Sequence, residues 1–259
     1  MYAFDVERPT TLAEAAAALG GDNQALGGGQ TLIPTLKARL ANPDKLVSLA
    51  DISEMKGIKL EGRLLRIGGS TVHADVASDG TYSALSELAS HIGDPAVRSR
   101  GTIGGSIANN DPAACYPAAA LGSGATIVTN TREIAADDFF QGMFETNLND
   151  GEIVTAVKFP VPEKANYQKF VQPASRFALV GVFVAKFPDG VRVAVTGASN
   201  DGVHRWSAAE DALSADFSAS AIEALSVPAE NLISDLHGSP EYRAHLVKVI
   251  TGRAVTAAS

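Results

Sequence analysis

The chain has 259 residues, of which 46% are hydrophobic, and 21 Lys plus Arg stand against 29 Asp plus Glu, a net charge of −8. This length and composition predict one large globular domain or two smaller ones and exclude disordered and fibrous proteins. The acidic balance argues against nucleic-acid binding, which needs clustered Lys and Arg. No apolar run reaches the ~18 residues of a membrane span.

Cysteine is nearly absent from the sequence. Cys115 is the one cysteine, so an internal disulfide is impossible, and an iron–sulfur cluster, which needs about four thiolates, is excluded too. Any redox chemistry must therefore use an organic cofactor or another chain. Residues 1–9 carry charges and lack an apolar signal core, which predicts a cytoplasmic location.

The first part of the chain alternates helix and strand patterns. Residues 11–19 predict a helix capped by Thr10 or Thr11 with Glu14 three residues on, and Gly20-Gly21 ends it. Further on, a strand, a helix and a strand at this spacing predict a small parallel βαβ unit. These three elements are predicted over residues 24–27, 31–40 and 46–49.

The pattern from residue 57 onward is that of an α+β protein. The elements predicted here are a hairpin (58–60 and 64–68), a helix (82–91), a Gly-rich turn (101–106) and two strands (125–129 and 152–159). Two prolines in residues 160–164 predict a linker. Beyond it the predictions are strands at 167–171, 178–187 and 191–199, and helices at 218–225 and 239–254.

Residues 25–34 contain three successive glycines at a strand-to-helix junction. Glycines let backbone N–H groups turn toward an anion, and a helix start adds its dipole, as a pyrophosphate site requires. The segment is neither a Walker A loop nor a Rossmann fingerprint. A plain tight turn is the alternative for this segment.

Residues 101–112 form a second Gly-rich segment. Gly104 and Gly105 lie between Thr102, Ser106 and Asn109, whose side chains can hydrogen-bond phosphate or ribityl hydroxyls. The alternative is a loop with local Asx and Ser/Thr turns. Two such loops can converge on one diphosphate, so the pair points to a phosphate site more strongly than either segment alone.

The other candidate motifs favour structural roles. Gly122-Ser123-Gly124 precedes a predicted strand, the reverse of a dinucleotide fingerprint, and is predicted as a turn. No Gly-x-Ser-x-Gly elbow exists, and the apolar run around Cys115 favours buried packing. No metal site is predicted, because no two histidines share i, i+4 spacing. No catalytic residue is predicted either. The histidines are His73, His91, His204, His237 and His245.

Lys169 lies on a predicted strand and Arg176 follows it. A lysine there could meet the carbonyls of a flavin or a phosphate. A solvated strand charge is the alternative for Lys169.

Together these segments resemble the FAD-binding medium subunits of the molybdenum hydroxylases, the family of xanthine dehydrogenase and carbon monoxide dehydrogenase. The resemblance covers essentially the whole chain, and length and layout are most similar to the carbon monoxide dehydrogenase medium chains. It is strongest in residues 25–34, 97–106, 111–114 and 151–154, and it extends to Tyr242-Arg243 and residues 253–255.

The resemblance implies an α+β fold: a two-part FAD-binding domain of the PCMH type, then a small domain with a three-stranded antiparallel sheet and helices. The implied domains are residues 1–163, with subdomains of about 1–56 and 57–163, and residues 164–259. Two positions differ from the family pattern, since Cys115 stands where Asp is common and Ser106 where Asn is common.

The family holds the FAD diphosphate between the two glycine loops, so the resemblance implies cofactor contacts at the matching residues. They are Leu26, Gly27, Gly28, Gly29, Gln30, Thr31 and Leu32 on the first loop, and Thr102, Gly104, Gly105, Ser106 and Asn109 on the second. Ile153 and Val154 fall where apolar residues pack near the flavin, and Lys169 falls where a lysine approaches its ring. Valine at Gly28 or Gly105 is predicted to abolish FAD binding and leave the chain folded.

The implied function is that of an FAD-binding electron-transfer subunit of a molybdenum hydroxylase. The molybdenum cofactor would lie in a large partner chain and [2Fe-2S] clusters in a small one, in a dimer of heterotrimers, and FAD would pass electrons to an external acceptor. One alternative is a self-contained flavin oxidoreductase with its own substrate pocket. A second alternative is a non-enzymatic scaffold subunit that has lost FAD.

Overall fold

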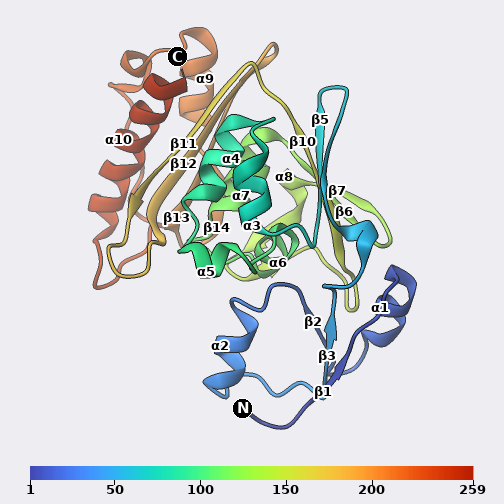
Figure 1. Cartoon of the computed structure of the whole chain (residues 1–259). Helices are drawn as coiled ribbons and strands as arrows, with labels where there is room; N and C mark the ends of the chain where they lie inside the picture. The colour runs from blue at the N-terminus through green and yellow to red at the C-terminus, as the bar shows by residue number, and fades with distance from the viewer. Residues whose placement is uncertain (259) are drawn as a thin grey trace.

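The structure, a computed structural model, describes residues 1–258. It contains three main sheets with helices between and around them (Figure 1). The elements in chain order are β1 (Asp5–Glu7), α1 (Leu12–Ala18), β2 (Gln24–Leu26), α2 (Leu32–Lys37), β3 (Lys45–Ser48), the 3₁₀ helix η1 (Ser53–Met55), β4 (Ile58–Glu61), β5 (Leu64–Gly68), α3 (His73–Asp79), α4 (Ser83–Ser90), α5 (Pro95–Arg98), α6 (Ile103–Asn109), α7 (Cys115–Ser123), β6 (Thr126–Thr129), β7 (Glu133–Ala135), α8 (Ala136–Phe139), β8 (Phe140–Gly142), β9 (Glu145–Thr146), β10 (Val154–Pro160), β11 (Lys164–Val171), β12 (Ala178–Phe187), β13 (Gly190–Ser199), β14 (Gly202–Arg205), α9 (Ser207–Ala215), the 3₁₀ helix η2 (Ala219–Ile222) and α10 (Pro240–Ala258).

The N-terminal unit is the blue lower part of Figure 1. Its sheet has the order β1-β3-β2 with parallel pairing, so the predicted parallel βαβ unit is confirmed. The predicted cap is confirmed too, because the Thr11 hydroxyl accepts from the Glu14 N–H while the Glu14 carboxylate accepts from the Thr11 N–H. Helix α2 is shorter than predicted, and Arg39 just beyond it has a φ of 59°, which a helix cannot contain.

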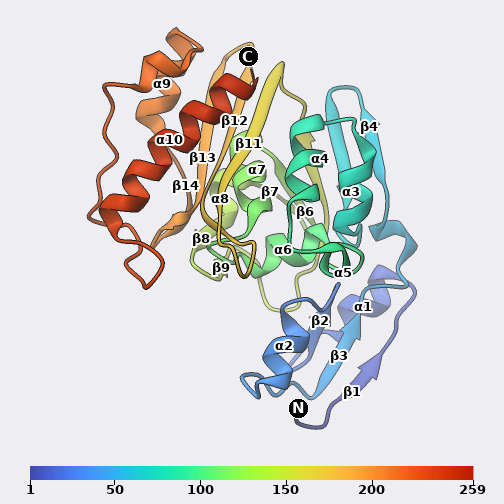
Figure 2. The same cartoon turned by 60° about the vertical axis from the view of Figure 1, so that its left-hand side comes forward.

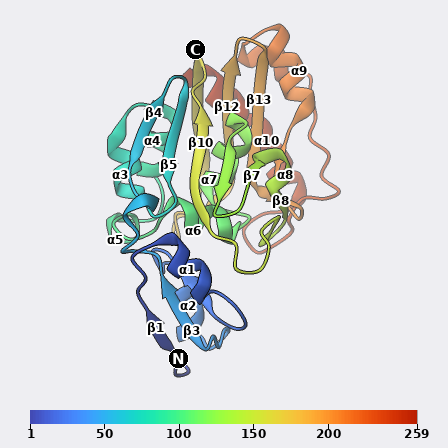
Figure 3. The same cartoon turned by 90° about the vertical axis from the view of Figure 1, so that its right-hand side faces the viewer.

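The middle unit is a five-stranded antiparallel sheet of order β4-β5-β10-β6-β7 with helices on one face (Figure 3). Every residue of α7 is buried, because this helix packs between β10 of this sheet and strands β12 and β13 of the next. The Gly-rich turn predicted at 101–106 contains the start of a helix, α6. The turn predicted at Gly122-Ser123-Gly124 is wrong for its first two residues, which form the last part of α7, and Gly124 alone leaves the helix as its left-handed cap.

The C-terminal sheet has four antiparallel strands of order β11-β12-β13-β14, one more than the predicted three. The extra strand, β14, is short and follows a turn, which hides it in the sequence pattern. Helices α9 and α10 cover the outer face of this sheet (Figure 2), and α7 covers the inner face. Two covered faces explain why β12 reads as a nearly continuous apolar run. The helix predicted at 218–225 is the short η2.

The predicted linker is a short connection held by the backbone. Pro160 ends β10 and Lys164 begins β11, and between them the Val161 N–H donates to Arg63 and the Glu163 N–H to Lys186. One hydrophobic core contains residues from both sides of this connection. The domain boundary at 163/164 stays a prediction. None of the helices described has both the length and the apolar character that crossing a membrane requires.

Candidate functional site

A cavity of about 650 Å³ lies where the N-terminal unit, helices α3, α5, α6 and α7, and the segment after β11 meet. Its size is in the range of ligand pockets. Of the residues predicted to contact a cofactor, Leu26 alone does not line it; its carbonyl accepts from the Leu49 N–H instead. The others line the cavity: Gly27, Gly28, Gly29, Gln30, Thr31, Leu32, Thr102, Gly104, Gly105, Ser106, Asn109, Ile153, Val154 and Lys169.

The first glycine loop, residues 27–32, supplies free backbone donors. Within the described chain, none of its N–H groups has a hydrogen-bond acceptor, although all of its residues line the cavity. Successive N–H groups without acceptors form a concave site for an anion. The loop can therefore bind a phosphate group without any charged side chain.

The two glycine loops touch each other. A Cβ atom built on Gly28 would lie 2.0 Å from the Arg100 carbonyl oxygen, and one on Gly27 would lie 2.9 Å from the Thr102 hydroxyl oxygen. Only glycine permits this approach, so Gly28 is required for the packing of one loop on the other.

In the second loop, residues 101–109, the N–H groups at the start of α6 are hydrogen-bonded within the protein. The Ile103 N–H donates to Thr71, the Gly104 N–H to Gly69, and the Gly105 N–H to the Thr102 hydroxyl. The loop therefore offers side chains and a smooth surface rather than backbone donors. Gly105 is the open point of that surface, because a Cβ there would meet the Thr102 hydroxyl oxygen alone, at 3.0 Å.

The segment 152–154 forms another wall of the cavity. The Arg132 guanidinium holds the Glu152 pKa at about 2 although burial opposes this shift, and hydrogen bonds from Asn149, Thr129 and Thr131 add to the lowering. Glu152 is thus ionised, and its bonds fix the segment that presents Ile153 and Val154.

The Lys169 side chain is held by hydrogen bonds and is not a solvated strand charge. Its Nζ donates to the carbonyls of His91 and Arg176, each at 2.8 Å, and lies 3.7 Å from the Cys115 sulfur. Lys169 therefore ties the C-terminal end of α4 to the segment that carries Arg176 and Phe177, both of which line the cavity.

Several lining residues could not be found from sequence spacing, because they are scattered along the chain. They include Gln24, Gly69, Ser70, His73 and Phe177. Burial, with the nearby Arg98 charge, lowers the pKa of His73 to about 4, so its imidazole is neutral at physiological pH. Its Nδ1 is buried and has no partner among the described residues.

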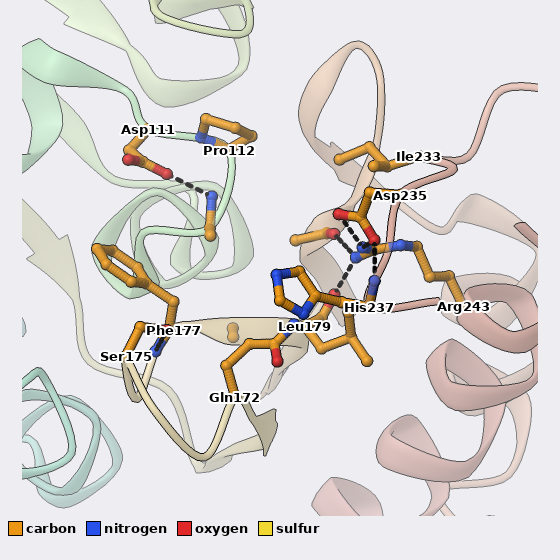
Figure 4. A pocket seen from close by; sticks show the side chains of 13 residues that line it. Asp111, Pro112, Gln172, Ser175, Phe177, Leu179, Ile233, Asp235, His237 and Arg243 are labelled. Carbon is orange, nitrogen blue, oxygen red and sulfur yellow. Dashed lines mark hydrogen bonds and ion pairs between the residues drawn. The ribbon is translucent and has the colours of Figure 1, made fainter. Parts of the chain in front are cut away.

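A smaller cavity of about 290 Å³ adjoins the first and shares Asp111, Ala113, Ser175 and Phe177 with it. Figure 4 shows the guanidinium of Arg243 facing the carboxylate of Asp235 there. Arg243 is buried and also donates to the carbonyls of Leu179 and Gly197. Its bonds hold α10 on the sheet, which is a structural role.

The described residues contain no group of three or more His, Cys, Asp or Glu side chains placed to hold a metal ion. The cavity instead combines a backbone anion site, hydroxyl and amide side chains and an apolar wall, features that suit a large cofactor with phosphate groups.

The chain is similar to known proteins over nearly its whole length. Residues 2–162 match the family described as the FAD binding domain in molybdopterin dehydrogenase. The chain is 34% identical to the carbon monoxide dehydrogenase medium chain of Afipia carboxidovorans, over 97% of this chain and 95% of that one. It is also 34% identical to the glyceraldehyde dehydrogenase medium chain of Sulfolobus acidocaldarius, over 97% of this chain and 96% of that one.

Solved structures agree with this likeness. A chain of quinoline 2-oxidoreductase from Pseudomonas putida 86 superposes with a TM-score of 0.88 at 30% identity, over 99% of this chain and 97% of that one. A chain of the reconstituted CO dehydrogenase from Oligotropha carboxidovorans gives a TM-score of 0.88 at 31% identity, over 99% of this chain and 98% of that one.

Proposed function

Since the chain belongs to the family of FAD-binding domains in molybdopterin dehydrogenases, we propose that its large cavity holds FAD between the two glycine loops. The chain is the FAD-binding subunit of a molybdenum hydroxylase, so the predicted family, the cofactor and the oxidoreductase class are confirmed. Its medium-subunit relatives imply large and small partner chains, which carry the molybdenum and iron–sulfur centres.

The observation that carries the proposed site is the row of unpaired N–H groups at residues 27–32. These groups would hold the diphosphate of FAD. Thr102, Ser106 and Asn109 would bind its hydroxyl groups or phosphate oxygens from the other side. When bound, FAD accepts electrons from the partner centres and passes them to an external acceptor.

The residues of this chain bind and orient the cofactor. Ile153 and Val154 form the apolar wall against which a flavin ring would pack, and both are almost fully buried. Lys169 positions Arg176 and Phe177 at the cavity, and it can reach a ring only by giving up one of its present contacts.

The visible spectrum of the purified chain tests the proposed site. After FAD is added and excess is removed, flavin absorption is expected, with about one FAD per chain. Flavin bands that are absent after reconstitution would contradict the site. Copurification of the chain with two further chains that carry molybdenum, iron and sulfide tests the assembly.

Sequence similarity favours no one substrate, because the carbon monoxide and glyceraldehyde dehydrogenase relatives have the same identity to this chain, 34%. A dimer of heterotrimers remains our proposal for the assembly, supported by the family resemblance, and the mass of the native complex tests it. The cytoplasmic location stays a prediction, which cell fractionation would test.

A further inference from the structure

Cys115, Tyr167 and Lys169 form a cluster at the wall of the large cavity, here called the thiol cluster. Cys115 begins α7, lines the cavity and is 6% exposed. Tyr167 and Lys169 alternate along β11, so their side chains leave the same face of the strand. That face is turned toward the thiol, since Lys169 Nζ lies 3.7 Å from the sulfur.

The cluster has donors but no good acceptor. The Tyr167 hydroxyl is buried, and within the described chain the Cys115 sulfur is the one acceptor beside it. Lys169 satisfies two of its three N–H bonds with carbonyl oxygens and directs the third at sulfur. Sulfur is a weak acceptor, so neither donor is well satisfied.

The start of α7 adds two more donors. Within the described chain, the N–H groups of Cys115 and Tyr116 have no acceptor, and both residues are buried. The positive end of the helix dipole lies at the same place. Hydroxyl, ammonium and backbone donors thus surround a sulfur atom, an arrangement that suits an anionic oxygen group at that position.

We propose that Cys115 is an oxidation site at which hydrogen peroxide converts the thiol to a sulfinate held by Tyr167 and Lys169. The first peroxide transfers one oxygen to sulfur, giving a sulfenic acid and water. The second peroxide does the same, giving a sulfinic acid and a second water; each step oxidises sulfur by two electrons and reduces one peroxide. The sulfinic acid then loses its proton to solvent.

The geometry favours the sulfinate as the end product of the oxidation. The two new oxygens become the acceptors that the Tyr167 hydroxyl and the third Lys169 N–H lack. Peroxide is small enough to reach Cys115 through the cavity that this residue lines. The inference concerns the flavin-free chain, so it goes beyond FAD binding and does not depend on it.

The test is peroxide treatment of the full chain freed of flavin, followed by peptide mass spectrometry. Because Cys115 is the one thiol, a gain of two oxygens on its peptide reports the sulfinate directly. We expect the wild-type sulfinate yield at a fixed time to exceed that of Tyr167→Phe by at least about tenfold, since a bond to a charged acceptor is lost. Tyr82→Phe is the matched control, because Tyr82 is equally buried but its hydroxyl pairs with Ser123. The sulfinate yield of this variant should equal that of the wild type.

Thermal unfolding gives a second readout. Tyr167→Phe should melt at or above the wild-type temperature, because it removes a buried hydroxyl that has only a weakly accepting sulfur beside it. The wild-type sulfinate form should melt above the reduced form. The proposal is overturned by a thiol that gains no oxygen, by equal sulfinate yields in wild type and Tyr167→Phe, or by a sulfinate form that melts below the reduced one.

Discussion

The two glycine loops look alike in sequence but differ in what they can offer a ligand. The N–H groups of residues 27–32 have no acceptor in the described chain, whereas those of Ile103, Gly104 and Gly105 bond within the protein. The first loop can therefore bind phosphate through its backbone. The second loop can bind it only through side chains on a smooth surface.

The difference arises from where each loop lies in the fold. The first loop is at the surface of the N-terminal unit, where no other segment reaches its donors. The second loop packs against residues 69–71, whose carbonyl groups accept from the N–H groups of Ile103 and Gly104, while the Gly105 N–H donates to the Thr102 hydroxyl. A glycine-rich segment thus indicates close backbone approach, but the partner can be a ligand or another part of the same chain.

The largest effect is expected from Gly28→Val, which separates the two loops. Its Cβ would meet the Arg100 carbonyl oxygen at 2.0 Å, so we expect a loss of about 3 kcal/mol in the free energy of unfolding, with FAD binding lost as well. Urea unfolding measures the stability. The sequence-based expectation is a variant that stays folded; the contact between the loops adds a loss of stability to that expectation. Unchanged stability would contradict the contact.

Gly105→Val should separate binding from folding. Its Cβ points into open space apart from the Thr102 hydroxyl oxygen, so the expected change in stability is below about 1 kcal/mol. FAD affinity should fall by about a hundredfold, or ~2.7 kcal/mol, in a titration followed by flavin fluorescence. Gly20→Val is the matched control, because a Cβ there meets nothing and the residue does not line the cavity. Equal FAD affinity in both variants would remove Gly105 from the site.

Glu152→Gln tests the segment 152–154, the wall of the cavity that neither glycine loop forms. The loss of its charged hydrogen bonds should cost about 2 kcal/mol at neutral pH. The Glu152 pKa is lowered to about 2 from 4.5, so its stabilisation is complete above pH 4.5 and is lost as pH falls through about 2. The difference in unfolding free energy between wild type and variant should follow that course. A difference that does not depend on pH would contradict the ion pair with Arg132.

Thr102→Val should give the smallest effect. The Thr102 hydroxyl accepts from the Gly105 N–H at the start of α6, so its loss should cost about 1 kcal/mol in thermal or urea unfolding. The freed Gly105 N–H would make the second loop more like the first. Thr102→Ser keeps the hydroxyl and should restore wild-type stability. If Ser and Val behave alike, the cap contributes nothing.

Local patterns were enough to predict much of the fold. The capping box at Thr11 and Glu14, the parallel βαβ unit and the long strands of the C-terminal sheet all follow from short-range signals. The strand β14, the helix α9 and the helical start within residues 101–106 were not predicted, because short elements and glycine-rich starts carry weak periodicity.

The sequence by itself determined the two glycine segments, the acidic charge, the single thiol and the family likeness, since all of these depend on residue identity and order. Tertiary structure alone decided which glycine meets backbone and which meets open space, and that Lys169 binds two carbonyls beside Cys115. The physical reason is that hydrogen-bond satisfaction depends on segments brought together from far along the chain. The cavity combines residues from Gln24 to Phe177, and no spacing in the sequence records that meeting.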